Sequence, residues 1–448
     1  MDPLMISVSG IRGIVGGSLK PEVIMKFCSA FGTLLNKGRV VVGRDTRVSG
    51  LMAKHAVFSG LIATGTEIID LGITTTPSVA ILVEELGVDG GVMISASHNP
   101  IQWNALKFFG SDGMLLNNKQ SEKLVSLYES EDYNYVDWIK LREPMEEHRT
   151  EEIHIRRVFE LINVERIRKC KFKVIVDSAN GGGASITRNM LSQLNCVLTE
   201  LNFDQHGYFE HDPEPNAENL KELCAMAQAG GYDIGFAQDP DADRLAVVSE
   251  QGEFIGEEYT LAMGAKYLLS ENPTDIVVNL STSRMVDDVA AEYGRTVYRS
   301  PVGEANVVEL MQKKKCGFGG EGNGGVIDAR AHYGRDSLVG IALILDWMAG
   351  SGKTVSELIR DIPKYHMIKE KMNIPADKTQ QVIGTLKEDI VSPKQDVSDG
   401  LRLDWEDRWI HLRPSNTEPV LRLIAEARTR EDARSMIEEF KSKIVELS

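Results

Sequence analysis

The sequence predicts an α/β protein whose last segment folds differently, as an α+β unit. Short apolar runs at 39–43 and 90–95 each end in a polar turn, and at 171–183 and 275–284 a similar strand and turn lead into helical periodicity. This alternation predicts parallel strands covered by helices. Such sheets bind their ligands at the carboxyl ends of the strands, which is where the unusual polar residues of this chain fall.

One helix near each end of the chain is well marked. Pro21 favours a helix start, and an apolar stripe then runs to Gly38, made of Ile24, Phe27, Phe31, Leu34 and Leu35. A last helix is expected over about 430–446. Before it, apolar residues alternate on both sides of a polar turn in 400–412, which predicts an antiparallel hairpin. The hairpin and the last helix make the final unit α+β.

The chain is long enough for several domains. Its 448 residues correspond to about three or four domains at roughly 100–200 residues each. Stretches near 130–152, 252–258 and 362–378 suggest breaks between them. We therefore expect four units, with boundaries at 1–152, 153–256, 257–366 and 367–448.

Composition and charge narrow the class of protein. A formal net charge of −16 argues against a nucleic-acid partner, because phosphate backbones require a basic surface. The five cysteines contain no C-x-x-C pair, which argues against a zinc site and against a disulfide framework. Neither a secretory signal nor a run of 18 apolar residues is recognisable, so we expect a cytoplasmic enzyme with no membrane partner.

The segment DPDADR at 239–244 has the clearest chemistry. Asp239, Asp241 and Asp243 alternate, so in an extended segment their three carboxylates would point the same way. Converging carboxylates repel one another unless a cation lies between them, and oxygen ligands favour a hard ion such as Mg²⁺. A solvated acidic turn is the alternative that this motif alone leaves open.

The segment SASHNP at 95–100 follows a predicted strand and leaves Ser97 uncovered in a tight turn, with His98 beside it. A serine phosphate here would be a dianionic donor and a natural partner for Mg²⁺. Lys107 lies ten residues further on among apolar neighbours, where a lysine can have a lowered pKa and carry a proton. Taken singly, a turn serine and a solvated lysine are usually structural.

Two polar loops lie nearer the C-terminus. The loop at 413–419 lies between two predicted strands and would form a compact cradle for an anion, with Arg413, Ser415, Asn416 and Thr417. An ordinary polar turn is the alternative that this motif alone leaves open. The glycine-rich loop at 319–325 carries Glu321 and Asn323, which pair well with sugar hydroxyls. Arg12 adds a cation near the N-terminus.

Two segments look like nucleotide loops and are not interpreted as such. Residues 320–325 match G-x-G-x-x-G, but a glutamate there would repel a pyrophosphate. Residues 350–354 resemble a Walker A loop, yet the position that requires its first glycine is Trp347.

The four motifs, in the order SASHNP, DPDADR, GEGNGG and RPSNTEP, resemble the α-D-phosphohexomutase family over the whole chain. That family includes phosphoglucomutase, phosphomannomutase and phosphoglucosamine mutase. Within it, this sequence most resembles the archaeal type of phosphoglucosamine mutase. The resemblance implies four domains around a central cleft: three related mixed α/β units and a C-terminal α+β domain. We expect a monomer or a homodimer.

The resemblance also implies a role for each motif. Ser97 matches the phosphoserine, which would share Mg²⁺ with Asp239, Asp241 and Asp243, while Lys107 matches the general acid/base. The other matching active-site positions are Arg12, His98 and Arg244. Glu321 and Asn323 match the loop that recognises the sugar, and the phosphate not undergoing transfer would be held by Arg413, Ser415, Asn416 and Thr417.

The implied reaction is reversible transfer of phosphate between the 6- and 1-positions of a hexose phosphate, through phosphoserine 97 and a hexose 1,6-bisphosphate that turns around. Glucosamine phosphate is the leading substrate. Asn323 with its two following glycines, and Asn416, depart from the bacterial glucosamine pattern, so mannose and glucose phosphates are close alternatives and a pentose phosphate is a weaker one.

Two other classes of function stay open at this point. A phosphatase would hydrolyse the serine phosphate, although hydrolysis has no use for a second phosphate cradle. A non-catalytic sugar-phosphate binding protein would have no use for an intact serine, lysine and aspartate set. The role of Glu304, where many relatives have histidine or aspartate, is not predicted.

Overall fold

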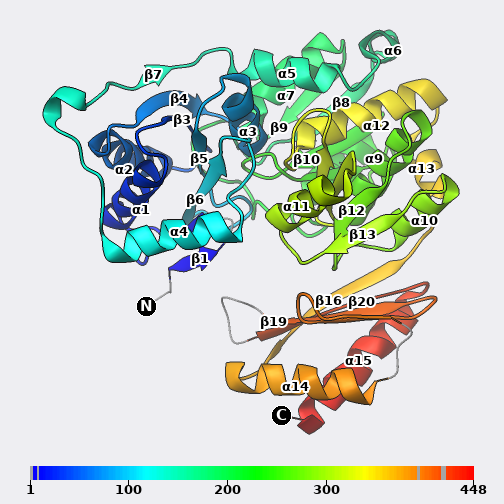
Figure 1. The fold of residues 1–448 in the computed structure, drawn as a ribbon. Helices are drawn as coiled ribbons and strands as arrows, with labels where there is room; N and C mark the ends of the chain where they lie inside the picture. Colours follow the sequence, from blue (N-terminus) through cyan, green and yellow to red (C-terminus); the bar gives the residue numbers. More distant parts are fainter. Residues whose placement is uncertain (1–3, 8–9, 391–393, 415–419, 448) are drawn as a thin grey trace.

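The computed structural model describes residues 4–7, 10–390, 394–414 and 420–447. These residues form four β-sheets, each built from one continuous part of the chain (Figure 1).

The first sheet has seven strands and contains the predicted strands at 39–43 and 90–95. Its order is β1 (Met5–Ser7), β2 (Gly10–Ile14), β6 (Trp103–Gly110), β5 (Gly90–Ile94), β3 (Arg39–Arg44), β4 (Glu67–Ile73) and β7 (Met145–Glu146). The strands β5, β3, β4 and β7 are parallel, whereas β6, β2 and β1 are antiparallel to their neighbours. The accompanying helices are α1 (Pro21–Leu34), α2 (Gly50–Ala63), α3 (Thr76–Glu85), α4 (Asn118–Ser130) and the short η1 (Trp138–Lys140). The first helix is confirmed, with Pro21 in its first turn and its apolar stripe in the core.

The second sheet has four strands, in the order β11 (Leu245–Val248), β10 (Ile234–Gln238), β8 (Lys173–Asp177) and β9 (Val197–Leu201). Its helices are α5 (Thr150–Phe159), α6 (Val164–Cys170), α7 (Gly183–Gln193) and α8 (Lys221–Gly230). Only β11 is antiparallel to its neighbour.

The third sheet repeats this order with β15 (Gly325–Asp328), β14 (Phe318–Glu321), β12 (Ile276–Asn279) and β13 (Val297–Ser300). Its helices are α9 (Glu257–Glu271), α10 (Met285–Glu292), α11 (Glu304–Lys314), α12 (Ser337–Ser351), α13 (Val355–Leu358) and η2 (Ile359–Asp361). The strands β6, β5, β3 and β4 of the first sheet have the same order and directions. The three α/β units are therefore related, as expected.

One hydrophobic core joins the second and third units. It runs from Val174 and Phe236 in the second sheet, through Leu245, to Phe318 in the third sheet and to Leu343 of α12. Among the described residues no single helix is long and apolar enough to span a membrane; α12 passes that test only together with the segment Val355–Asp361, at a bend of 86°. Its apolar residues are buried in this core.

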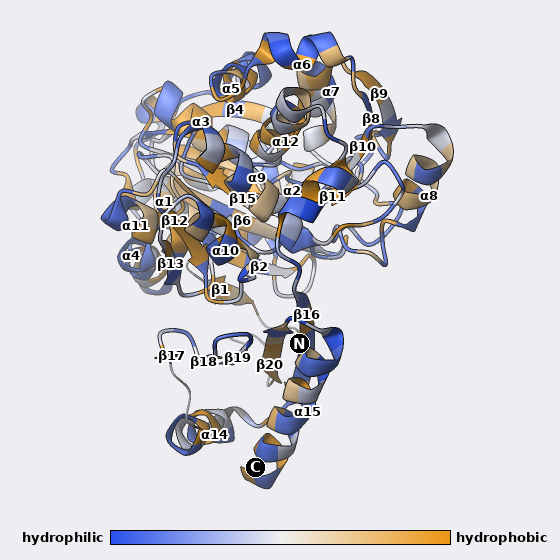
Figure 2. Ribbon diagram, turned by 90° about the vertical axis from the view of Figure 1, so that its right-hand side faces the viewer, coloured by the Kyte–Doolittle hydropathy of each residue, from blue (hydrophilic) through white to orange (hydrophobic). Residues whose placement is uncertain are grey.

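The C-terminal unit is different. Its antiparallel sheet has the order β16 (His366–Asn373), β20 (Val420–Ala427), β19 (Trp409–Pro414), β18 (Leu401–Asp404) and β17 (Lys394–Asp396), with helices α14 (Ala376–Asp389) and α15 (Arg430–Leu447). The hairpin and the last helix predicted from the sequence are confirmed as β18–β19 and α15. The unit has its own core. The chain enters it through β16, and in both views it lies below the rest of the molecule (Figures 1 and 2).

Candidate active site

Three of the predicted motifs occupy equivalent places in the three α/β units. Each lies in the loop between a parallel strand and the antiparallel strand that follows it: 95–102 between β5 and β6, 239–244 between β10 and β11, and 322–324 between β14 and β15. In all three the motif begins at or just beyond the carboxyl end of the parallel strand, where such sheets bind ligands. The repeated fold thus presents three different loops at corresponding positions.

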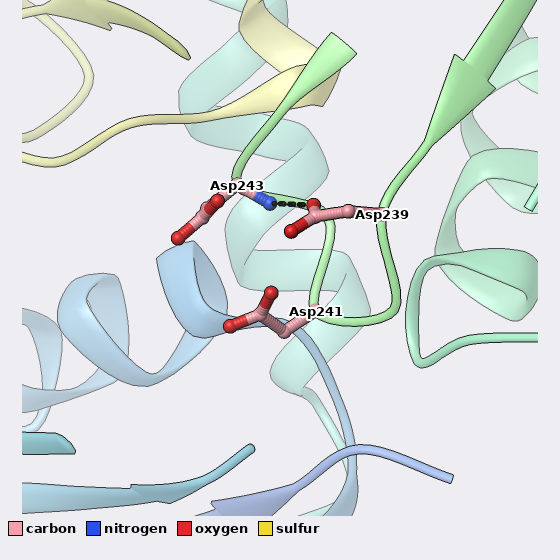
Figure 3. Close-up of side chains that lie close together, drawn as sticks. All are labelled: Asp239, Asp241 and Asp243. Atoms are coloured by element: carbon pink, nitrogen blue, oxygen red, sulfur yellow. Dashed lines mark hydrogen bonds between the residues drawn. The ribbon is translucent and has the colours of Figure 1, made fainter. Parts of the chain in front are cut away.

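The three aspartates of the second unit converge, as predicted. One carboxylate oxygen from each of Asp239, Asp241 and Asp243 lies within 4.8 Å of the others, and all three side chains are buried (Figure 3). Asp241 Oδ1 and Asp243 Oδ1 have no hydrogen-bond partner in the described part of the chain. Two buried carboxylate oxygens that accept no hydrogen bond within that part and lie beside a third carboxylate fit a hard cation.

The backbone that brings them together is not the extended segment that the sequence suggested. The loop turns, with Ala242 in the left-handed region at φ 54°. Asp239 Oδ1 accepts hydrogen bonds from the amides of Asp243 and Arg244, at 3.1 and 3.0 Å. The first aspartate therefore folds the chain back on itself, and a tight turn produces the convergence that alternation was expected to produce.

The charges around this cluster are unequal. Burial, together with Asp243 and Asp241, raises the pKa of Asp239 well above its usual range. Burial also acts to raise the pKa of Asp243, but Arg335 and Lys107 outweigh it and hold that pKa low. Crowded buried carboxylates that keep their charge need nearby cations, and here side chains supply part of that charge.

Ser97 faces the aspartates from the first unit. Its Oγ donates to Asp239 Oδ2 at 2.5 Å, across 142 residues of sequence. The backbone of Ser97 is in the left-handed region at φ 52°, which is unfavourable for a residue with a Cβ. Ser95 Oγ accepts the Ser97 amide at 2.9 Å, and the buried Arg47 donates to the Ser97 carbonyl at 2.6 Å. These bonds hold the strained turn that aims the hydroxyl.

His98 and Arg12 lie on the same side of the site. The Nδ1 of His98 is 3.3 Å from Ser97 Oγ, and Arg12 donates to Asn99 Oδ1 at 2.7 Å. Burial, with Arg244 and Arg12 nearby, lowers the pKa of His98 well below its usual value, so this imidazole is neutral. Arg244 Nε is buried without a hydrogen bond among the described residues and lies 3.9 Å from Asp243 Oδ1.

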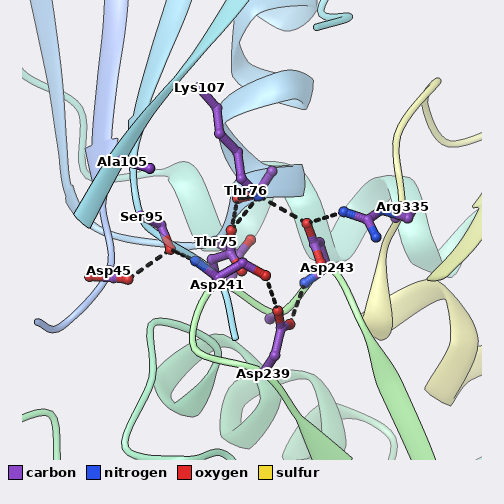
Figure 4. Close-up of polar contacts among 12 residues, drawn as sticks. Asp45, Thr75, Thr76, Ser95, Ala105, Lys107, Asp239, Asp241, Asp243 and Arg335 are labelled. Atoms are coloured by element: carbon purple, nitrogen blue, oxygen red, sulfur yellow. Dashed lines mark hydrogen bonds and ion pairs between the residues drawn. The ribbon is translucent and has the colours of Figure 1, made fainter. Parts of the chain in front are cut away.

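Lys107 contacts the cluster directly. Its Nζ donates to Asp241 Oδ2 at 2.6 Å, to Asp243 Oδ2 at 2.9 Å and to Thr76 Oγ1 at 3.2 Å (Figure 4). Burial acts to lower the pKa of Lys107, but Asp241 and Asp243 outweigh it, so the pKa is raised. The lowered pKa expected from its apolar neighbours in sequence is therefore wrong, because two carboxylates from another unit face the ammonium.

Arg335 was not predicted from the sequence. This buried guanidinium pairs with Asp243 at 2.7 Å, with Glu304 at 2.7 Å and with Glu321 at 3.0 Å. It lies just before Asp336, whose carboxylate accepts the Leu338 amide and caps α12. An arginine directly before a helix cap, after a strand end, was the one available signal. Arg335 also places Glu304 in the site, as its ion-pair partner.

Thr76 was also missed. It lies in the first turn of α3, and its hydroxyl donates to Asp241 while accepting from Lys107. The run of threonines before Pro77 indicated a helix start and no chemistry.

Two further groups of predicted residues lie in the third and C-terminal parts of the chain: Glu321 and Asn323, and the loop that begins at Arg413. Glu321 Oε1 accepts from Asn279 Nδ2 at 2.8 Å and from the Gly303 amide at 3.0 Å, while its Oε2 faces Arg335. Asn323 Oδ1 is buried and has no partner within the described ranges. Arg413 lies on β19 and pairs with Asp399 at 2.8 Å. Ser415, Asn416 and Thr417 lie outside the described residues.

Comparison with known proteins matches the whole chain to one family. Four family models match in order: phosphoglucomutase/phosphomannomutase alpha/beta/alpha domain I at 5–135, domain II at 152–252, domain III at 257–365, and the C-terminal domain at 371–443.

Individual relatives agree. A "probable phosphoglucosamine mutase" of Methanopyrus kandleri is 35% identical over 436 residues, and a "phosphoglucomutase/phosphomannomutase" of Thermococcus kodakarensis is 38% identical over 441 residues; each alignment covers 96% of both chains. A crystal structure of a phosphoglucomutase/phosphomannomutase family protein from Burkholderia thailandensis superposes with a TM-score of 0.86 at 26% identity, covering 99% of this chain and 98% of that one.

Proposed function

This chain belongs to the phosphoglucomutase/phosphomannomutase family of sugar-phosphate isomerases, and we propose that it transfers phosphate reversibly between the 6- and 1-positions of a hexose phosphate. One observation carries the proposal: a strained turn presents Ser97 Oγ 2.5 Å from Asp239, inside a buried cluster of three aspartates and Lys107. This is the arrangement needed by a serine that carries a phosphoryl group next to a divalent cation.

We propose Mg²⁺ as the cation, held by Asp239, Asp241 and Asp243 with an oxygen of Ser97. The buried Oδ1 atoms of Asp241 and Asp243, which accept no hydrogen bond from the described residues, support this assignment. When bound, the ion would neutralise negative charge on the phosphoryl group during transfer.

Each residue of the site has a proposed role in the transfer of the phosphoryl group. A hydroxyl of the sugar phosphate attacks the phosphorus and the bond from Ser97 Oγ to phosphorus breaks. The Lys107 ammonium is proposed to give a proton to Ser97 Oγ and to take the hydroxyl proton in its place, so that both groups end protonated. Arg244, Arg12 and the neutral His98 are proposed to contact the phosphoryl group, since His98 Nδ1 lies 3.3 Å from Ser97 Oγ. The bisphosphorylated sugar then turns around and returns its second phosphate to Ser97.

The remaining motifs hold the substrate. Glu321 and Asn323 are proposed to bind sugar hydroxyls, since their loop lies beside Arg335 and the metal cluster. The phosphate that is not being transferred is assigned to a cradle made of Arg413, Ser415, Asn416 and Thr417.

Glucosamine phosphate is our leading substrate, and mannose or glucose phosphate is the alternative. The names of the two archaeal relatives divide between these choices. A pentose phosphate ranks lower. A phosphatase or a binding protein is disfavoured, because hydrolysis has no use for the second phosphate cradle, and binding alone has no use for Ser97 beside three aspartates.

A coupled assay tests the proposal. The 1-phosphates of glucosamine, mannose, glucose and ribose are compared with Mg²⁺ and a trace of the matching bisphosphate, and kcat/KM is expected to be highest for glucosamine 1-phosphate. Ser97→Ala should abolish turnover while circular dichroism shows an intact fold. Release of inorganic phosphate as fast as isomerisation would instead identify a phosphatase.

A further inference from the structure

We propose that Asp399 is a positioning residue that links Arg413 of the C-terminal unit to Glu321 of the third α/β unit. This link, called the tie below, fixes the position of Arg413 relative to Glu321, so that both ends of the sugar phosphate are held at the correct separation. The inference rests on the proposed function, which assigns the sugar to Glu321 and the non-reacting phosphate to Arg413.

A single carboxylate oxygen joins the two units. Asp399 Oδ2 accepts from Arg413 Nε at 2.8 Å and from the Val302 amide at 2.9 Å. The next amide along the chain, that of Gly303, donates to Glu321 Oε1 at 3.0 Å. Gly303 has φ +123°, a conformation that a residue with a side chain rarely adopts, and this lets consecutive amides serve two carboxylates. One peptide unit therefore separates the partner of Arg413 from Glu321.

A second route supports the same tie. His411 Nε2 donates to the Asp399 carbonyl at 2.7 Å, and burial lowers the pKa of His411 to about 4, so the ring is neutral. Its Nδ1 must then accept from Ser281 Oγ, at 2.9 Å. The Ser281 amide donates to Asn279 Oδ1 at 2.8 Å, and Asn279 Nδ2 donates to Glu321 Oε1 at 2.8 Å. Both donors to Glu321 Oε1 therefore lead back to Asp399.

Other contacts hold the C-terminal unit in place. Arg402 is buried and donates to the Leu280 carbonyl, while Arg284 donates to the carbonyls of Glu406 and Trp405, at 2.6 and 2.8 Å. Because these bonds do not involve Asp399, its removal should leave the unit attached. Removal of Asp399 should instead disturb the position of Arg413 relative to Glu321.

A double-mutant cycle tests the tie. Asp399→Ala, Glu321→Gln and the double variant are assayed with Mg²⁺ and the preferred sugar 1-phosphate of the panel. Each single change should lower kcat/KM by roughly 10- to 100-fold, the first mainly through KM. The kcat/KM of the double variant should be about fivefold or more higher than the value expected if the two single losses multiplied, because Glu321 is already misplaced without Asp399. Losses that multiply within about twofold, or an unchanged Asp399→Ala variant, would overturn the tie.

Asp396→Ala is the matched control. This aspartate lies on β17 of the same sheet and, among the described residues, its side chain accepts hydrogen bonds only from the amide and the hydroxyl of Ser398. Asp396→Ala should leave kcat/KM within about twofold of the wild type. When it is combined with Glu321→Gln, the two effects on kcat/KM should simply multiply.

Hydrogen exchange supplies a readout that needs no activity. The Gly303 amide bonds to Glu321 and makes no bond to Asp399, so faster exchange there in Asp399→Ala, and unchanged exchange in Asp396→Ala, reports the coupling itself. Unchanged exchange at Gly303 in both variants would refute it. If the wild type turned over no sugar phosphate, the proposed function would fail, while this measurement would still decide on the tie.

Discussion

At Arg335, one guanidinium pairs with three carboxylates that come from different segments: Asp243 in the aspartate loop 239–244, Glu321 at the end of β14 and Glu304 at the start of α11. A planar fork with five donors can do this, whereas an ammonium group is a single point of charge. Arg335 therefore fixes the glycine-rich loop 319–325 relative to the aspartate loop 239–244.

Arg335→Lys should lower kcat/KM by roughly 100-fold, because a lysine cannot hold the three carboxylates in one plane. Steady-state kinetics with the preferred sugar phosphate measures this. Arg330→Lys is the control, since the Arg330 side chain, within the described ranges, pairs with Asp328 alone and is partly exposed. Equal, small effects in the two variants would show that Arg335 is not a fixing point.

Single residues differed in how far the sequence could predict them. The aspartates and Ser97 stand in dense local motifs, so the sequence alone was enough to expect their convergence. Arg335 and Thr76 could not be found, because nothing near them in the chain signals the carboxylates they meet. For Lys107 the sequence misled, because its apolar neighbours suggested burial and did not reveal Asp241 and Asp243.

At the scale of elements, the hairpin β14–β15, which carries the glycine-rich loop, packs against the hairpin β10–β11, which carries the aspartate loop. The amide of Leu245 donates to the Gly324 carbonyl at 3.1 Å, and Gly324 itself has φ +86°. A Cβ added there would lie 2.2 Å from the Leu245 carbonyl oxygen. The two hairpins can approach this closely only because position 324 has no side chain.

Gly324→Ala should cost about 2–4 kcal/mol of unfolding free energy and displace the loop that carries Asn323, lowering kcat/KM as well. Urea denaturation and kinetics measure the two effects. Gly352→Ala is matched in backbone, at φ +67°, but its Cβ meets no atom within 4 Å, so it should cost only about 1 kcal/mol. Comparable losses in both variants would contradict the role of close packing at Gly324.

The contact between β19 and the loop after β12 should depend on pH. Burial depresses the pKa of His411 from 6.5 to about 4, so the unfolded chain binds a proton more readily than the folded one. This residue's contribution is complete above pH 6.5 and is lost as pH falls towards 4. The wild type should therefore lose about 2 kcal/mol more stability than His411→Gln between pH 7 and 5. Denaturant unfolding followed by tryptophan fluorescence checks this, and parallel pH profiles would disprove it.

Element prediction succeeded where periodicity was local. The hairpin β18–β19 and the helices α1 and α15 follow directly from alternation, a proline and apolar stripes. The aspartate loop was misjudged, because its turn depends on Asp239 capping two amides, and alternating letters do not reveal such a cap.

At the scale of the molecule, metal binding should be coupled to folding, since the three aspartates meet only in the folded chain. Mg²⁺ at about 100 times its Kd should add about 2.7 kcal/mol of stability, seen as a higher thermal midpoint, and chelation should abolish turnover reversibly. Asp241→Asn should reduce the shift, and KCl at equal ionic strength should not reproduce it. An equal shift in wild type and variant would place the ion elsewhere.

The fold class was predictable, but the equivalence of the three loops was not. Strand order and direction, which reveal the repeat, depend on pairings between distant segments such as β8 with β10. The unit boundaries chosen from composition stay predictions.

The continuous core beneath the second and third sheets has a mechanical consequence. Two units that share interior side chains cannot slide past one another without opening that interior to water. They form a single rigid block that carries both the three aspartates and Glu321. A rearrangement of the proposed site would therefore have to come from movement of the first unit or of the C-terminal unit against this block.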